Sequence, residues 1–499
     1  MTVSVGLDIG TSGARAVAVD EAGRALAIAA SPYPLLTPRP RWAEQDPEQW
    51  WRAAQAVLAE VITRVAGDGG GRPVAAIGLT GQMHGAVFLD ARGDVIRPAL
   101  LWNDQRTGRQ TAWITERVGR DRLIKIAGNP ALTGFQAPKV IWLRDEEPAS
   151  YRRLAHVLLP KDYVRYRLTG ELATDASDAA GTLFLDLRAR NWSAELCDAL
   201  DVDVGWLPRV YESPEPAGVV RPAVAAGLGL PASVPVAAGG GDNAAAAIGT
   251  GVTRDGVASS SIGTSGVVFA HSDAPVIDAA GGVHAFCHAV PGAYCLLGVT
   301  LSAGGSLRWW RDVTGRDYAE LTEEAAAVPA GSEGLLFLPY LTGERSPHAD
   351  PDARGAFFGL TARHTRGHMT RALMEGVLFS LRQALEAIAA LGVRPTEIRA
   401  TGGGSGSPLW RRLQADIYRM PVRRLAVDEG AAYGAALLGH VAGGTLADVG
   451  QAAALARPVA DADEPDPANE AVYEDLYAVY RDLYRATAPD MHRLSRLQR

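Results

Sequence analysis

Residues 3–9 alternate between apolar and polar side chains, with the apolar set on one face and Asp8 on the other. A period of two predicts a β-strand with one buried face. The letters GTSG at residues 10–13 predict a tight turn, because glycine and small hydroxyl residues favour turns. Residues 14–20 then read as the returning strand, so the chain is predicted to open with a β-hairpin.

Helical patterns alternate with further strand patterns along the chain. Asp46 and Pro47 predict the start of a helix, since aspartate caps and proline fits the first helical position. A buried strand is predicted at residues 72–81 and a long helix at about 367–391. Ser407 and Pro408 predict another helix start. This alternation is typical of layered α/β folds.

The opening phrase recurs later, where DIGTSG at residues 8–13 is matched by SIGTSG at residues 261–266. Both copies sit in a strand–turn–strand context, which indicates a duplicated domain with a boundary near residues 248–256. The predicted division is 1–247, 255–445 and 446–499. In the last part, residues 451–470 are expected to form a surface linker, followed by an amphipathic helix packing back on the body.

Composition narrows the function classes. The chain has 499 residues, 47% of them hydrophobic and 21% charged, as expected for a globular protein of two or more domains. A net charge of −7 argues against nucleic acid as a partner. The three cysteines, the lack of a signal-like segment and the lack of a long apolar run predict a cytoplasmic protein without a membrane partner.

The two glycine turns are candidates for phosphate binding. Successive backbone amides in such turns form a concave anion site, to which the hydroxyls of Thr11, Ser12, Thr264 and Ser265 add donors. Neither turn contains lysine, and the chain lacks the P-loop pattern, so phosphate would be bound by amides, hydroxyls and a metal ion. The alternative is that both turns are ordinary hairpins.

Asp8 stands two residues before the first turn, whereas Ser261 occupies the matching place before the second. A carboxylate beside a phosphate site repels the phosphate unless a divalent cation lies between them, and Mg²⁺ takes carboxylate and phosphate oxygens. Asp8 is therefore a candidate Mg²⁺ residue. The alternative is an aspartate that bonds to its own turn.

Asp242 lies in the stretch GGGDNAAAA, among small residues that leave room for a ligand. A lone carboxylate there suits a general base acting on a hydroxyl. The alternative is a helix N-cap. The glycines at 402–404 follow a strand and precede a helix, which favours either an anion site or an ordinary turn. His284 and His288 are expected to be structural, because they lie in a strand pattern.

Together these segments resemble the FGGY carbohydrate kinases, from residue 1 to about 445. The resemblance rests on GLDIGTSGARA, GLTGQMHG, LLWNDQR, GGGDNAA, SIGTSGV, TGGGS and the long segment FLPYLTGERSPHADPDARGAFFGL. It implies an α/β fold of two duplicated actin-like, ribonuclease-H-like domains around a deep catalytic cleft. Sugar would bind the N-terminal domain and ATP mainly the C-terminal one.

The resemblance also implies roles for individual residues. Asp8 would hold Mg²⁺, and Asp242 would be the catalytic base for ATP-dependent phosphorylation of D-xylulose at O5. The other implied contacts are Met83, His84, Asn243, Trp102 and Asp104 for sugar, and Thr11, Ser12, Gly263, Thr264, Gly402 and Gly403 for ATP. The Met-His pair disfavours glycerol, for which the family shows Arg-Glu. Gln136 departs from the family pattern, which bears on the sugar preference.

Other readings of the same resemblance stay open. The substrate could be another ketose or polyol such as L-ribulose, and a non-catalytic sugar-sensing relative or an actin-like polymer would share the fold. A sensing relative has no need of both Asp8 and Asp242. A homodimer is left open as the assembly.

Overall fold

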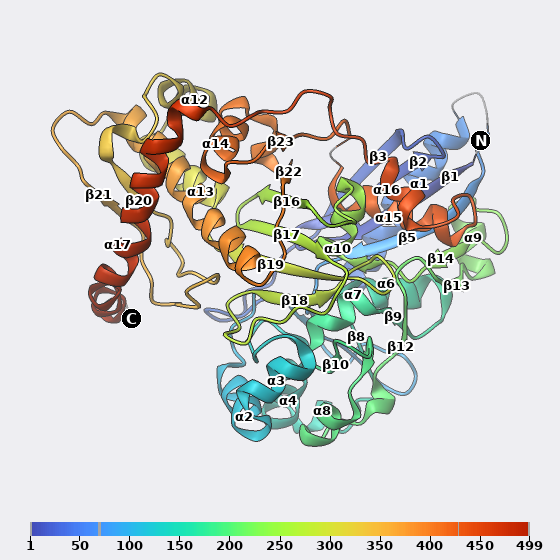
Figure 1. Cartoon of the computed structure of the whole chain (residues 1–499). Coiled ribbons are helices and arrows are strands. Elements are labelled where there is room, and N and C mark those ends of the chain that lie inside the picture. Colours follow the sequence, from blue (N-terminus) through green and yellow to red (C-terminus); the bar gives the residue numbers. More distant parts are fainter. Residues whose placement is uncertain (1, 68–70, 428, 498–499) are drawn as a thin grey trace.

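The computed structural model describes residues 2–67, 71–427 and 429–497 (Figure 1). The strands are β1 (Val3–Ile9), β2 (Gly13–Asp20), β3 (Ala25–Pro32), β4 (Glu44–Gln45), β5 (Val74–Gly81), β6 (Val87–Leu89), β7 (Ala99–Leu100), β8 (His156–Leu158), β9 (Ala173–Asp175), β10 (Leu185–Asp186), β11 (Asn191–Trp192), β12 (Arg209–Tyr211), β13 (Pro216–Val219), β14 (Pro235–Ala237), β15 (Gly240–Gly241), β16 (Val257–Ile262), β17 (Gly266–Ser272), β18 (His284–Cys287), β19 (Tyr294–Thr300), β20 (Leu336–Leu338), β21 (Ala356–Phe358), β22 (Glu397–Thr401) and β23 (Val422–Arg423). The helices are α1 (Pro47–Gly67), α2 (Gly108–Val118), α3 (Arg120–Ala127), α4 (Gln136–Glu146), α5 (Pro148–Tyr151), α6 (Pro160–Thr169), α7 (Ala176–Ala179), α8 (Ala194–Ala199), α9 (Pro222–Leu228), α10 (Asp242–Thr250), α11 (Gly304–Thr314), α12 (Tyr318–Ala326), α13 (Arg366–Ala390), α14 (Pro408–Tyr418), α15 (Gly430–Ala442), α16 (Val449–Ala454) and α17 (Glu470–Leu497).

Two sheets with matching strand order form the centre of the molecule. The first runs β13-β14-β5-β1-β2-β3, with β15 pairing beside β5, and the second runs β18-β19-β17-β16-β22-β23. In both sheets the first hairpin is antiparallel, and its first strand pairs in parallel with a later strand. The register also matches, since Asp8 faces Thr80 and Ser261 faces Thr401. The expected duplication is confirmed.

The prediction that residues 3–9 bury one face is wrong, because both faces of β1 are covered. Helix α1 packs on one side, and α15 lies so close on the other that a side chain on Gly6 has no room. A Cβ atom at Gly6 would lie 1.9 Å from the carbonyl oxygen of Ala432. The residues that alternate as polar are small ones that admit a helix backbone.

Helices α10 and α15 form the layer between the two sheets (Figure 1). Helix α15 comes from the second half of the chain but packs on β1, β2 and β5 of the first sheet. The chain therefore crosses between the halves after residue 429 as well as near residues 248–256. The predicted three-part division stays a prediction, and α15 shows that sequence order and packing differ there.

Residues 101–211 form a lobe that contains α2, α3, α4 and α8, and these helices lie at the bottom of the view in Figure 1. It shares one hydrophobic cluster with the second half, because its side chains pack against β18. Asn129 in this lobe donates a hydrogen bond to the carbonyl of Ala285 over 2.7 Å. The lobe thus reaches across to the second half beside the site described below.

The C-terminal helix α17 packs back on α13, α14 and β20, as predicted (Figure 1). Its buried side includes Tyr473, Tyr477 and Tyr480. The expected linker at 451–470 is wrong in its first residues, because α16 extends through Ala454 and buries Ala452 against α15. Alanine-rich sequence fits a buried helix as readily as a linker, since small side chains allow close helix packing.

The structure has three buried cysteines that form no disulfide bond: Cys197, Cys287 and Cys295. Across the described ranges, the structure contains no helix that combines the length and apolar character needed to cross a membrane.

Candidate active site

The first glycine turn is held in place by side chains from the surrounding loops. Tyr33 donates a hydrogen bond to the carbonyl of Gly10 at 2.5 Å, and Gln45 donates to the carbonyl of Thr11 at 2.7 Å. The indole of Trp102 donates to the Thr11 hydroxyl at 3.0 Å, which itself donates to Gln82 at 3.3 Å. The turn is therefore preorganised, because the carbonyls of Gly10 and Thr11 already accept hydrogen bonds.

The two hydroxyls of this turn differ. The Thr11 hydroxyl is engaged by Gln82 and Trp102, so any hydrogen bond from Thr11 to ATP would come from its backbone N–H, and its role stays a prediction. Ser12 is exposed and free to meet a ligand. Gln45 and Gln82 escaped the sequence analysis, although Gln82 lies inside the GQMHG motif.

Asp8 and Asp242 come together from the end of β1 and the start of α10. Burial raises the pKa of Asp8 to about 7, with a further rise from the Asp242 carboxylate and an opposing effect of Arg15. Arg15 itself is paired with Glu429. The Oδ1 atom of Asp8 is buried without a hydrogen-bond partner among the described residues. The alternative that Asp8 bonds to its own turn finds no support in these contacts.

Asp242 is the first residue of α10, and Gly241 occupies the cap position that the alternative reading gave to Asp242. Burial raises the pKa of Asp242 to about 6, against two hydrogen bonds from Asn243 that lower it. These come from the backbone N–H at 2.7 Å and the side-chain Nδ2 at 2.8 Å. A carboxylate with this pKa is ionised at neutral pH and remains basic enough to accept a proton.

Met83 and His84 follow β5 and lie next to this carboxylate pair. The Met83 sulfur is 3.8 Å from Nδ2 of Asn243, which places it beside Asp242. His84 has a φ of 66° and turns its Nδ1 to the carbonyl of Gly181 at 2.8 Å. Its ring packs against Phe135, with centroids 4.7 Å apart. Their role as sugar contacts stays a prediction.

The expectation that Asp104 contacts the sugar needs correction. Its side chain is completely buried, and its oxygens accept hydrogen bonds from Arg106 at 2.7 Å and from the backbone of Ala43 at 2.7 Å. These bonds leave it no free face for a ligand, so it braces the loop. Trp102, two residues earlier, is partly exposed and stays a candidate through its ring.

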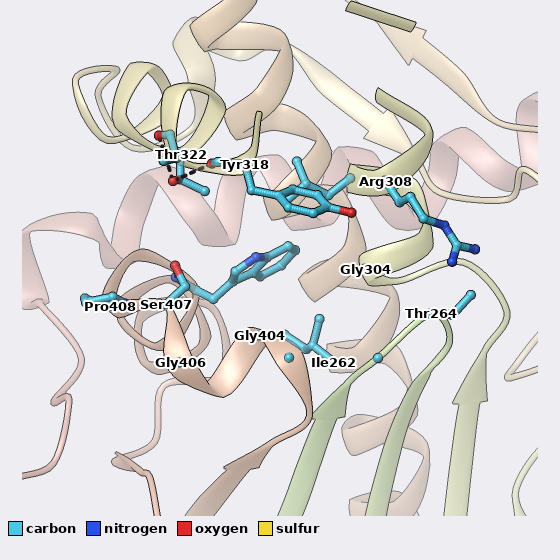
Figure 2. Close-up of a pocket in the computed structure, with 15 residues that line it drawn as sticks. Ile262, Thr264, Gly304, Arg308, Tyr318, Thr322, Gly404, Gly406, Ser407 and Pro408 are labelled. Carbon is cyan, nitrogen blue, oxygen red and sulfur yellow. Dashed lines mark hydrogen bonds between the residues drawn. The ribbon is translucent and has the colours of Figure 1, made fainter. Parts of the chain in front are cut away.

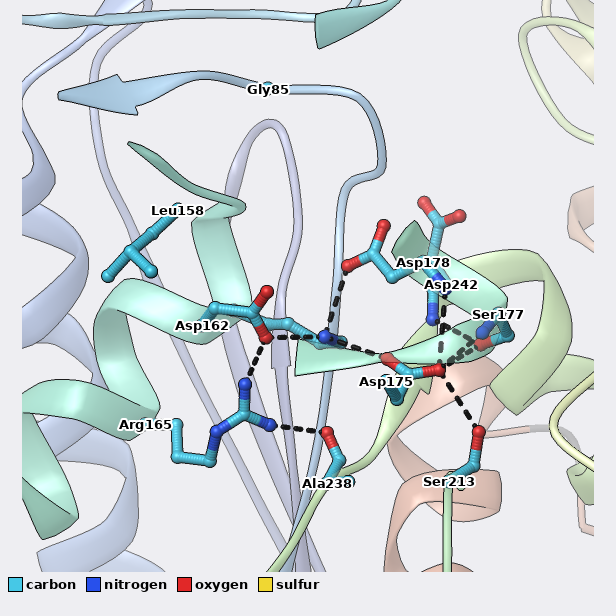
Figure 3. A network of polar contacts seen from close by, with 12 residues as sticks. Gly85, Leu158, Asp162, Arg165, Asp175, Ser177, Asp178, Ser213, Ala238 and Asp242 are labelled. Carbon is cyan, nitrogen blue, oxygen red and sulfur yellow. Dashed lines mark hydrogen bonds and ion pairs between the residues drawn. The ribbon is translucent and has the colours of Figure 1, made fainter. Parts of the chain in front are cut away.

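A buried cluster of charges supports the loop that carries Asp242 (Figure 3). The Nζ atom of Lys161 lies 2.6 Å from Asp162, 2.8 Å from Asp175 and 3.3 Å from Asp178. Asp175 accepts from the Ser177 hydroxyl at 2.5 Å, and that hydroxyl accepts from the N–H of Gly241 at 3.2 Å. The cluster therefore fixes the residue directly before Asp242.

Protonation of one carboxyl group balances the charges of this cluster. Three carboxyl groups face the two cations of Lys161 and Arg165, and burial raises the pKa of Asp178 well above its usual range, which favours its neutral form. Burial alone would lower the pKa of Lys161, but the neighbouring carboxylates raise it instead. Lys161 therefore stays charged, and the cluster is a buried network of ion pairs that supports the site.

Two further residues sit behind the sugar-side loop. Gln136 is buried and donates from Nε2 to the carbonyls of Gly85 and Leu158, at 2.9 and 3.2 Å. Lys139 is also buried and donates to the carbonyl of His84 at 2.9 Å. Burial lowers the pKa of Lys139 to about 7. Gln136 therefore holds the backbone next to His84.

A cavity of about 640 Å³ opens beside the second glycine turn (Figure 2). It is lined by Ile262, Gly263, Thr264, Gly304, Leu307, Arg308, Tyr318, Ala319, Thr322, Gly403, Gly404, Gly406, Ser407, Pro408 and Trp410. Figure 2 shows the Tyr318 ring along one wall and the Arg308 side chain near Thr264. Apolar walls with a few polar groups are typical of a nucleotide site.

The predicted ATP residues divide between the two halves. Gly263, Thr264 and Gly403 line the cavity, whereas Thr11 and Ser12 belong to the first turn. Gly402 does not line it. It has a φ of 74°, and a Cβ there would lie 2.9 Å from the carbonyl oxygen of Ile262, so this glycine shapes the turn. Tyr318 and Trp410 escaped prediction, because α12 and α14 meet the turn only after folding.

His284 and His288 are both buried. Both ring nitrogens of His288 have partners, in line with a structural role, whereas Nε2 of His284 lacks a partner among the described residues. The Nε2 atom of His288 lies 2.9 Å from the carbonyl of Val252, and its Nδ1 accepts from Val290 at 3.0 Å. Among the described residues, close metal-ligand spacing occurs instead at Asp255, His271 and Asp273, two of which are exposed.

The duplicated sheets, the paired carboxylates and the cavity beside the second turn define a phosphotransferase of the actin-like ATPase fold. The model of the FGGY family of carbohydrate kinases, N-terminal domain, matches residues 3–249, and that of the C-terminal domain matches residues 258–443. The chain belongs to the FGGY carbohydrate kinases and is a sugar kinase that uses ATP.

Individual relatives extend along the whole chain. The xylulose kinase of Escherichia coli (strain K12) is 40% identical over 490 residues, covering 98% of this chain and 99% of that protein. The xylulose kinase of Lactococcus lactis subsp. lactis is 39% identical over 501 residues, covering 99% of each. The crystal structure of xylulose kinase from Rhodospirillum rubrum is 34% identical with a TM-score of 0.91, covering 98% of this chain and 99% of that one. The expected family and fold are confirmed.

Proposed function

We propose that this protein transfers the γ-phosphoryl group of ATP to O5 of D-xylulose, with Asp242 as general base. The observation that carries the proposal is the meeting of Asp8 and Asp242, two carboxylates with raised pKa, beside the loop that carries Met83, in a chain whose matching second turn lines a cavity. The substrate follows from relatives that act as xylulose kinases over their whole length.

The residues present fit a Mg²⁺ ion at Asp8. Its Oδ1 is buried and lacks a hydrogen-bond partner within the described ranges, which is costly for a carboxylate unless a cation binds it. Asp242 adds a second negative charge nearby. When bound, Mg²⁺ neutralises negative charge on the phosphates. Asp8 would hold it, and Ser261 at the matching place adds no competing charge.

Asp242 takes the proton from the attacking hydroxyl. It is ionised at neutral pH, and its two hydrogen bonds from Asn243 fix the orientation of the carboxylate. The buried cluster that holds Gly241 keeps the carboxylate in place. Phosphoryl transfer depends mainly on such positioning and on charge stabilisation.

The two halves divide the substrates between them. Met83, His84 and Trp102 face the sugar from the first half, with Asn243 orienting the base. Gly263, Thr264 and Gly403 meet the nucleotide from the second half, with the base of ATP against Tyr318. The amides of the first turn and Ser12 complete the phosphate site. Closure around the connection at 248–256 would exclude water from the reaction.

The three buried, unpaired cysteines support a proposed location in the reducing cytoplasm. A homodimer stays an open prediction, which analytical ultracentrifugation of the purified chain would test.

The decisive experiment is a panel of sugars in a coupled assay of ADP release. D-xylulose is expected to give the highest kcat/KM, with L-ribulose, glycerol and D-gluconate well below it. A higher kcat/KM for any other sugar would refute the substrate proposal and leave the kinase class intact.

A further inference from the structure

Arg345, in the loop between β20 and β21, reaches from the second half toward the sugar side of the first half. An Nη2 atom of its guanidinium lies 3.9 Å from the place that a Cβ at Gly134 would take. The same Cβ would lie 2.7 Å from the carbonyl oxygen of Trp102, a predicted sugar residue. Arg345 therefore stands next to the loops that carry Trp102 and His84, although it is distant from both in sequence.

The backbone of Arg345 is tightly held. Glu344 is 2% exposed, and it accepts hydrogen bonds from the Thr300 hydroxyl at 2.5 Å and from the backbone N–H groups of Leu301 and Arg345 at 3.0 and 2.7 Å. The hydroxyl of Ser380 donates to the same carboxylate at 3.2 Å. Glu344 thus anchors the loop, and its carboxylate oxygens accept hydrogen bonds from groups other than the guanidinium of Arg345.

The guanidinium itself makes no hydrogen bond or ion pair with any residue that the structure describes. It carries a full charge in a half-buried position, and burial lowers the pKa of Arg345. A buried charge without a partner is unfavourable, and arginine has five N–H groups to satisfy. Such a group is expected to meet a ligand that supplies oxygen atoms.

The imidazole rings of His84 and His284 lie close to the Arg345 guanidinium. Arg345 lies close enough to His84 and His284 to lower the pKa of both rings, in addition to the larger effect of burial. The pKa of His284 falls to about 3. Both rings are packed around Phe135 and Phe286. The two histidines are therefore neutral at physiological pH.

The hydrogen bonds of these rings set their tautomers. Nδ1 of His84 faces the carbonyl of Gly181, which can only accept, so Nδ1 carries the proton. Nδ1 of His284 lies 2.8 Å from Oδ1 of Asn129, whose Nδ2 donates to Ala285. Oδ1 is thus the acceptor and Nδ1 again the donor. In both rings Nε2 is left as an acceptor.

His284 adds a second unsatisfied group to the same place. Its side chain is 4% exposed, and its Nε2 is buried without a partner among the described residues. A buried acceptor and a half-buried donor, neither with a partner among the described residues, together fit a ligand group that can both donate and accept, such as a hydroxyl.

We propose that Arg345 and His284 complete the sugar site from the second half and bind the end of the sugar that is remote from Asp242. The guanidinium donates to the oxygens at C1 and C2 of the ketose, and the Nε2 atoms of His84 and His284 accept from its hydroxyls. Met83 lies beside Asp242, whereas Arg345 lies close to His84 and His284 and is not among the groups that shift the pKa of Asp242. This inference rests on the proposed function and adds the residues that recognise the oxygen atoms at C1 and C2 of the sugar.

The site combines one cation with two neutral acceptors, which suits an uncharged hydroxyketone. It also makes sugar contacts depend on both halves, because Met83, His84 and Trp102 come from the first and Arg345 from the second. Binding of the sugar therefore favours the arrangement in which the halves are together.

The test compares Arg345→Met, Arg345→Lys and His284→Gln with the wild-type enzyme. Arg363→Met is the matched control, since that side chain is 79% exposed in the same half of the chain. The readouts are KM for D-xylulose, KM for ATP, kcat, and ADP affinity by calorimetry. Circular dichroism and thermal unfolding check that each variant is folded.

Arg345→Met is expected to raise KM for D-xylulose about 10- to 100-fold, as for a lost hydrogen bond to a charged group. KM for ATP and ADP affinity stay within about twofold, since the nucleotide site is separate. Arg345→Lys recovers part of the loss, and His284→Gln gives a smaller rise in KM for the sugar. The Arg363→Met control matches the wild type.

A substrate lacking one oxygen locates the contact. 1-Deoxy-D-xylulose lacks the C1 hydroxyl, so the wild-type enzyme is expected to use it less well than D-xylulose. Arg345→Met should discriminate between the two sugars much less, because residue and hydroxyl form one interaction. Equal discrimination in both enzymes would overturn the assignment of Arg345 to the C1–C2 end.

Two other results would overturn the inference. One is a folded Arg345→Met enzyme whose KM for the sugar is unchanged or whose KM for ATP rises as much. The other is a wild-type enzyme with a higher kcat/KM for D-xylonate than for D-xylulose, which would make Arg345 a carboxylate site. If the wild type instead prefers another ketose, the proposed substrate fails, and the variants are then measured with that sugar.

Discussion

The pKa of Asp242 makes a sharp prediction about pH dependence. The base must be ionised to accept a proton, and its pKa in the structure is about 6. We therefore expect kcat/KM for the sugar to rise from acid pH to a plateau above neutrality, with a midpoint near that value. With such a midpoint, about a tenth of the plateau activity remains one pH unit below it.

Asn243→Ala removes one of the two hydrogen bonds that hold this pKa down. The bond from Nδ2 of Asn243 to Asp242 is 2.8 Å long, and hydrogen bonds to charged groups contribute about 1.5 kcal/mol. At about 1.4 kcal/mol for each pKa unit, the midpoint should rise by about one pH unit. At the wild-type midpoint the relative activity then falls from about a half to about a tenth.

The assay is coupled ADP release from pH 5 to 9 at saturating Mg²⁺, which keeps Asp8 ionised. Met83→Leu serves as the control, because Met83 lies 3.8 Å from Asn243 and makes no hydrogen bond to Asp242 among the described contacts. It is expected to change KM and leave the midpoint in place. An Asn243→Ala profile with the wild-type midpoint, or a wild-type midpoint below pH 5, would refute the assignment of Asp242 as base.

Four further predictions test neighbouring parts of the argument. Asp242→Asn should fold normally and lose several orders of magnitude in kcat, and near-wild-type turnover in the ADP assay would contradict the base role. Asp8→Asn should weaken the use of Mg·ATP, seen as a higher Mg²⁺ requirement, so an unchanged Mg²⁺ titration counts against it. Ser261→Asp should raise the Kd for ATP by repulsion, and indifference would show that this position does not face the phosphates. Lys161→Met should lower the free energy of unfolding by about 3–5 kcal/mol, because it leaves the buried carboxylate of Asp175 without its cation. Denaturant unfolding measures this loss against Lys125→Met, an exposed control, and equal stability of the two variants would rule out the cluster as a stabilising unit.

Several features of the fold could be predicted from short stretches of sequence. The hairpin at residues 3–20, the helix that starts after Asp46 and the helix that starts after Ser407 all appear as expected. Their signals are local, since turns, caps and alternation depend on neighbouring residues. The repeated GTSG phrase also predicted the duplication, because each copy shapes its own strand pair.

Other features depended on contacts between distant segments. The burial of both faces of β1 follows from α15, which lies more than 400 residues later in the chain. Asp104 had the type and position of a sugar residue, yet Arg106 and Ala43 occupy it. Local sequence shows which polar groups are present but not which are already satisfied.

The sequence alone was enough to place Asp8, Asp242 and the two glycine turns in a sugar kinase of the FGGY family. Strand alternation, turn residues and isolated carboxylates among small residues are local signals, because each depends on neighbouring residues in the sequence. Their surroundings cannot be predicted in this way, because Arg345 meets the loop of Gly134, Tyr318 meets the second glycine turn and Lys161 meets Asp178 only when distant segments pack together. Burial and electrostatic coupling arise from that packing, so the raised pKa values and the unpaired arginine belong to the folded molecule.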